Sequence, residues 1–66
     1  MDLDTLIKFY QAMKAKKAAA LLEKLPAELA AEVLGAMKSR QAGKILDAMQ
    51  PAPAVRISQL MAGRKR

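Results

Sequence analysis

Two stretches, AMKAKKAAALL at residues 12–22 and AMKSRQAGKIL at residues 36–46, align when the chain is shifted by 24 residues. Five of the eleven aligned positions are identical, and Met61 lies a further 24 residues beyond Met37. Both stretches place Ala and Leu or Ile at the spacing of a helix face. A two-helix unit of this length cannot bury its apolar face alone, so the repeat predicts helical hairpins that stack into a curved array.

Helical spacing of apolar residues continues over most of the chain, and no stretch alternates with the period of a strand. The fold class expected is therefore all-α, with about five helices of roughly ten residues joined by turns of two to four residues. Capping and proline chemistry place the boundaries. The expected caps and breaks are Asp2 or Asp4 for the first helix, Pro26 for the third, Ser39 for the fourth, and the pair Pro51 and Pro53.

The chain has 66 residues, of which 53% are hydrophobic but only two are aromatic. This length suits one domain, which we place at residues 1–62, followed by a disordered basic tail at residues 63–66. No apolar run approaches the roughly 20 residues of a membrane span. Asp2 and Asp4 follow Met1 directly and are unlike a secretory leader, so any export or anchor segment is expected to lie outside this chain.

Catalysis and cofactor binding are not expected. The sequence has no Cys and no His, which removes thiolate nucleophiles, imidazole bases and most transition-metal ligands. A pairing of Ser39 with Lys38 or Lys44 is formally possible, but Ser39 occupies a position typical of a helix cap. Glu28 and Glu32, one helical turn apart, are the only carboxylates expected to share a face, and they suit the start of their helix.

The charge is distributed unevenly along the sequence. The net charge is +6, and all of it arises in residues 34–66, because residues 1–33 balance five bases with five acids. A basic half attracts acidic partners, whether nucleic acid, anionic lipid or an acidic protein surface. Nucleic-acid binding is the weakest of these predictions, since the basic residues are not interleaved with aromatic side chains that could stack on bases.

A basic strip repeats with the helices and is the predicted protein-binding surface, suited to an acidic partner. Its residues are Lys14, Lys16 and Lys17 in the first unit and Lys38 and Arg40 in the second. Three methionines are spaced by 24 residues: Met13, Met37 and Met61. We predict that they fill gaps between hairpins, and the alternative is that they line a groove that binds a partner. Self-association is a further possibility, because a short stack has two apolar ends.

The phrases FYQAMKAKKAA at residues 9–19 and AMKSRQAGKILDAMQP at residues 36–51 resemble a known helical repeat. It occurs at the N-terminus of MgtE-type magnesium transporters and in the C-terminal domain of the flagellar motility protein MotE. The resemblance covers about residues 4–61 and is greater to the MotE branch. It implies a right-handed superhelical stack of hairpins that acts as an interaction or regulatory module rather than as an enzyme.

Two functions follow from this resemblance. A MotE-like chain would be a periplasmic chaperone or partner-binding domain for a flagellar motor or stator-associated protein. The alternative is a cytosolic, Mg²⁺-sensing N-domain fragment of an MgtE-type transporter. The charge favours the first, because a net charge of +6 repels a divalent cation at long range.

Overall fold

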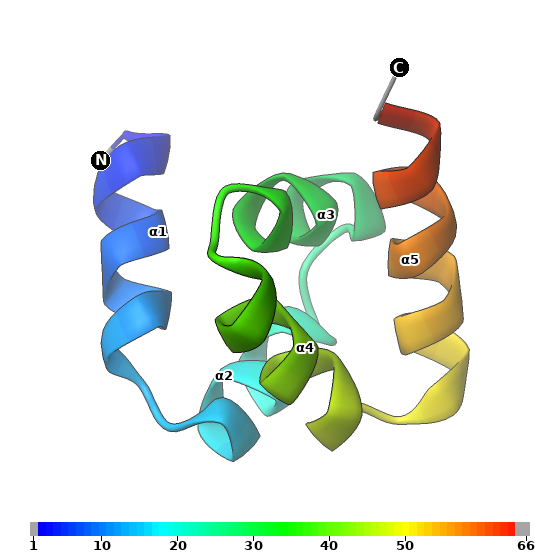
Figure 1. Cartoon of the computed structure of the whole chain (residues 1–66), viewed down its shortest axis with the longest axis horizontal. Coiled ribbons are helices and arrows are strands. Elements are labelled where there is room, and N and C mark those ends of the chain that lie inside the picture. The colour runs from blue at the N-terminus through cyan, green and yellow to red at the C-terminus, as the bar shows by residue number, and fades with distance from the viewer. Residues whose placement is uncertain (1, 65–66) are drawn as a thin grey trace.

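The computed structural model describes residues 2–64, which form five helices and no strand (Figure 1). Linkers of two to four residues join them. The all-α class, the number of helices and the linker lengths predicted from the sequence are therefore confirmed. The helices are α1 (Leu3–Ala12), α2 (Ala15–Leu22), α3 (Ala27–Gly35), α4 (Ser39–Ala48) and α5 (Pro51–Arg64).

The helices begin at regular intervals, each start lying twelve residues after the previous one. At every start the backbone amide of the fourth helical residue donates to the carbonyl of the residue just before the helix. These five hydrogen bonds are 2.9 to 3.2 Å long. The structural period is therefore half of the 24-residue sequence repeat, since each repeat contains two similar helices.

A pair of apolar residues recurs at four of these starts. The fourth helical residue is alanine each time, and the residue two positions before the helix is large and apolar. A hydrophobic residue ahead of the cap commonly packs on the fourth residue and fixes the angle at which the chain enters the helix. All eight side chains belong to the core or pack against it. The pairs are Met13 with Ala18, Leu25 with Ala30, Met37 with Ala42, and Met49 with Ala54.

Successive units stack through equivalent helices. The most extensive contacts join α3 to α5, α2 to α4, and α1 to α3, whereas the two helices within a unit make smaller contacts with each other. In Figure 1, α1 and α5 stand on opposite sides with α3 between them, and α2 and α4 lie side by side below. The three principal extents are 24, 24 and 22 Å, because so short a stack is about as wide as it is long.

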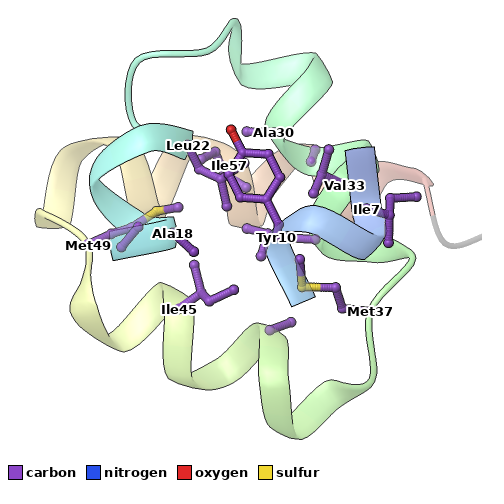
Figure 2. Close-up of a cluster of buried hydrophobic side chains, with 14 residues drawn as sticks. Ile7, Tyr10, Ala18, Leu22, Ala30, Val33, Met37, Ile45, Met49 and Ile57 are labelled. Carbon is purple, nitrogen blue, oxygen red and sulfur yellow. The ribbon is translucent and has the colours of Figure 1, made fainter. Parts of the chain in front are cut away.

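All five helices contribute to one core (Figure 2). The largest fully buried side chains are Leu22, Val33, Leu34 and Ile57, and no polar residue among those described is buried. Met37 is 8% exposed and Met13 is half-buried against the same cluster. Both methionines therefore contribute to the core, as the repeat predicted for equivalent layers.

Three boundary predictions differ from the structure in detail. Pro51 and Pro53, expected in a break, lie in the first turn of α5, where the missing amide donor of proline is tolerated. Ser39 is the first residue of α4 rather than its cap; the cap is Lys38, which makes no side-chain capping hydrogen bond. The backbone bends at Met37, one residue earlier than a Ser39 cap requires, so Ser39 already belongs to the first turn. Gly63 and Arg64, expected in the basic tail, form the end of α5. Lys65 and Arg66 lie outside the described residues.

Asp2, one of the two residues predicted as the cap of α1, is the cap. Its Oδ1 accepts a hydrogen bond of 2.9 Å from the backbone amide of Thr5. Hydrogen bonds from the Thr5 side chain, and then from the Thr5 amide, hold the pKa of the Asp2 carboxyl below its ordinary value. The ionised carboxylate is therefore the form that stabilises the start of α1.

A pH-dependent contribution to stability follows for this cap. Folding lowers the pKa of the Asp2 carboxyl. The contribution of Asp2 to the free energy of unfolding is therefore complete above the pKa that this carboxyl has in the unfolded chain. It is lost as the pH falls through the lower pKa that the carboxyl has in the folded chain. Urea unfolding of the parent and Asp2→Ala should therefore differ at neutral pH and converge in acid. A difference that persists unchanged into acid would show that the charge of Asp2 does not act in the cap.

Candidate protein-binding site

The predicted basic strip lies at the starts of α2 and α4, two helices that pack against each other. Lys14 and Lys38 immediately precede these helices and have nearly identical backbone geometry, with φ and ψ of −67° and 144° at Lys14 and −65° and 146° at Lys38. Lys16, Lys17 and Arg40 lie in the first turns. All five side chains are exposed. We call this set the basic edge.

The positive charge of the basic edge is unfavourable for the stability of α2 and α4, because it lies at their N-termini. Helix N-termini carry partial positive charge and favour acidic or capping side chains. The first turns of α2 and α4 contain no acidic residue, and neither helix has a side-chain cap. No basic-edge residue forms an ion pair within the described part of the chain. Five cations and two helix N-termini thus present the same sign of potential at one end of the α2–α4 pair.

Next to the basic edge is a shallow hollow of about 230 Å³. Met13 and Met37, which directly precede the two cap lysines, both line it. Apolar side chains line the hollow together with the polar Gln11, Gln41 and Lys44, and its volume suits one bulky side chain of a partner. The methionines therefore serve the core and also line a surface hollow. It is lined by Tyr10, Gln11, Met13, Ala15, Met37, Gln41, Lys44 and Ile45.

The described residues offer no evident metal centre. Nowhere in residues 2–64 do three or more carboxylates or other metal-ligating side chains gather. Glu28 is exposed and Glu32 is half-buried on α3. Among these same residues, no helix is long and apolar enough to cross a membrane.

The comparison with protein-family models identifies the fold family. The family described as the MgtE intracellular N domain matches residues 1–62. The chain belongs to this family. Comparisons with curated proteins and with solved structures give no match. The match confirms the predicted resemblance to the MgtE N-terminal repeat, while the comparisons give no support to the MotE branch or to a flagellar function.

The family match does not assign the basic edge, which stays a prediction. The sequence identified its five residues and offered a methionine groove as the alternative role of Met13, Met37 and Met61. Two of these methionines, Met13 and Met37, line the hollow, whereas Met61 does not. That hollow depends on the packing of α1 and α2 against α4 and is visible only in the folded chain.

Capping the bare helix starts should stabilise the fold. Lys14→Asp introduces a capping acceptor and a charge that suits the N-terminus of α2, so we expect a gain of about 1 kcal/mol. For a domain of this size such a gain raises the Tm by roughly 4–8 °C. Lys14→Ala, which removes the charge without adding a cap, should gain less in the same thermal melts. A lower Tm for Lys14→Asp would mean that the lysine stabilises α2.

Proposed function

We propose that this chain acts as a regulatory docking module of an MgtE-type magnesium transporter, without catalytic activity. The family match over residues 1–62 supports this function, which the sequence analysis held as its alternative to a MotE-like role. The description of the family as an intracellular domain likewise favours the cytoplasmic location over the periplasmic one.

The observation that carries the proposal is the uncompensated charge of the basic edge. Sites that break local stability rules are often functional, because a partner supplies the missing interaction. An acidic protein surface would neutralise the lysines and accept hydrogen bonds from the free helix starts. An apolar side chain of that surface would fill the hollow over Met13 and Met37. Charge would then set the rate of encounter, and the hollow would add to affinity.

Regulation in this proposal acts through protein contact rather than through a magnesium site within the chain. Mg²⁺ requires oxygen ligands, usually from one or two carboxylates together with waters. The net charge of +6 repels a divalent cation at long range. In this proposal the partner is another intracellular part of the transporter, and it carries the acidic surface that binds the basic edge.

The direct test is titration calorimetry with the remaining intracellular domains of an MgtE-type transporter from the same organism. Binding should weaken as salt rises, and Lys14→Glu with Lys38→Glu should weaken it by about tenfold or more. The matched control is Lys8→Glu with Arg56→Glu, which makes the same charge change at exposed positions of α1 and α5 and should bind as the parent does.

Two results would overturn this function. One is the absence of binding to those domains. The other is a Tm of the isolated chain that rises steeply with millimolar Mg²⁺, because a ligand that binds the folded state stabilises it and the chain would then hold the ion itself. Capture of a flagellar motor or stator-associated protein in place of the transporter would instead favour the MotE branch.

A further inference from the structure

The twelve-residue period identifies two sets of equivalent positions with opposite burial patterns. In the first set, Val33, Ile45 and Ile57 are at most 3% exposed, while their equivalents in α1 and α2 are Phe9, at 49%, and Leu21, at 40%. This set is thus buried in the last three helices and exposed in the first two. A residue that packs toward the preceding layer would show this pattern, because no helix of residues 2–64 precedes α1 and α2 in the stack.

The second set shows the reverse pattern. Ile7, Ala19 and Ala31 are at most 8% exposed in the first three helices. Their equivalents in α4 and α5 are Gly43, whose missing Cβ would meet no atom within 4 Å, and Val55, which is 56% exposed. These positions pack toward the following layer, and the helices described supply no such layer beyond α4 and α5.

The stack therefore has two open ends that use the same packing positions as its interior. We name Phe9 and Leu21 the leading face, and Gly43 and Val55 the trailing face. Three of the four large apolar side chains that are exposed in the described chain lie on these faces; the fourth is Leu3. Repeat proteins normally close such ends with polar caps, and this chain exposes apolar side chains there.

We propose that copies of this chain stack end to end, with the leading face of one copy docked on the trailing face of the next. A second copy placed at the next step of the period sets its α1 on α4 and its α2 on α5, which continues the alternation of the interior contacts. This inference does not depend on the proposed function. Its apolar faces differ from the hollow beside the basic edge, and Lys14 is the one basic-edge residue that it also uses.

Side-chain size supports this partner. In the helix pairs that contact each other in the interior, the period sets the small Ala19 and Ala31 of the second set against the larger Ile45 and Ile57 of the first set, and Ile7 against Val33. Across the proposed junction, Gly43 meets Phe9 of the next copy, and Val55 meets Leu21. The smallest position of the trailing face thus opposes the largest side chain of the leading face, as close packing requires.

One polar contact of the interior also has an equivalent at the junction. The Oε2 of Glu23, at the end of α2, accepts a hydrogen bond of 2.8 Å from the backbone amide of Gln50, which precedes α5. Asp47 is the equivalent of Glu23 in α4 and is exposed. In the next copy, the residue that corresponds to Gln50 is Lys14, which precedes α2. Asp47 would therefore accept from the Lys14 amide across the junction, beside a lysine of opposite charge.

A junction between different faces leaves each end of the assembly open, so association should continue beyond a dimer. Sedimentation analysis of the whole chain at rising concentration should show an average mass that grows past twice the monomer mass. Moderate salt should favour this growth, because it screens the repulsion between copies that each carry a net charge of +6.

Single-face variants test the direction of stacking. Phe9→Glu blocks the leading face and Val55→Glu blocks the trailing face, so each should weaken self-association by about ten- to a hundredfold. Mixed together, the two variants retain one free face of each kind and should form a heterodimer that grows no further. Ala20→Glu, an added carboxylate at an exposed position of α2 on the side of the stack, is the matched control and should assemble as the parent does.

Circular dichroism separates loss of stacking from loss of fold, and both variants should keep the helicity of the parent because the substituted side chains are about half exposed. A chain that stays monomeric at every concentration would overturn the proposal. So would a closed dimer that persists in Phe9→Glu, or a mixture of the two variants that stays monomeric while the parent assembles.

Discussion

Leu34→Ala is expected to lower the free energy of unfolding by about 3–5 kcal/mol. Leu34 is 0% exposed and lies on α3, the helix that contacts both α1 and α5. Truncation of a buried leucine removes its transfer energy and leaves a cavity, with a loss of about 3–5 kcal/mol. A domain of this length has a total stability of roughly 3–10 kcal/mol, so a single truncation removes a large share of it. Urea unfolding followed by circular dichroism measures the loss.

The repeat supplies an internal control for this prediction. Leu46 is the equivalent of Leu34 in α4, but it is only half-buried against the core. Leu46→Ala should therefore cost clearly less than Leu34→Ala, although the chemical change is the same. Leu34→Met, which conserves volume, should cost less than about 1.5 kcal/mol. Equal losses at positions 34 and 46 would contradict a central place for α3.

Much of this fold can be predicted from the sequence because its breaks are chemically explicit. Pro26 and Pro51 cannot lie in the middle of a helix, and they stand at or just before the starts of α3 and α5. The Met-Lys pairs at residues 13–14 and 37–38 mark the other two turns. Between these breaks, helical spacing of apolar residues leaves a single choice of secondary structure.

The exact first residues of the helices were harder to predict, because they follow a twelve-residue period that is less obvious in the sequence than the 24-residue repeat. Ser39 has the chemistry of a cap, but the start of α4 is set by the bend at Met37, which packs into the core. Tertiary packing thus overrode a local preference that is worth about 1 kcal/mol. A shift by twelve residues aligns Ala18, Ala30, Ala42 and Ala54 and would have located all four starts.

The candidate surfaces could likewise be predicted only in part from the sequence. Exposure of the five basic residues could be expected, because charges seldom lie inside a core. Their position beside an apolar hollow, and the two open ends of the stack, depend on which helices pack together. The 24-residue repeat predicted that successive units stack, but only the structure shows that each helix packs chiefly against the one two steps away. Only that pairing shows Phe9 and Leu21 to be uncovered.

The alanines at the helix starts should resist enlargement. Ala30 is 0% exposed, and its amide donates to the Pro26 carbonyl at 3.0 Å in the first turn of α3. Leucine at this position would overfill the space under Leu25 and cost about 1–3 kcal/mol in urea unfolding. Ala54→Leu changes the equivalent alanine of α5, which is only half-buried, and should cost less.

A double-mutant cycle tests whether Leu25 is what limits the space at Ala30. If the two side chains share one volume, Leu25→Ala should offset part of the loss caused by Ala30→Leu, because the exchange nearly conserves the total volume. The double variant would then be more stable than the sum of the two single losses predicts. Strict additivity would show that Leu25 and Ala30 do not pack on each other, and the hydrophobic pairing inferred at four helix starts would be wrong at this one.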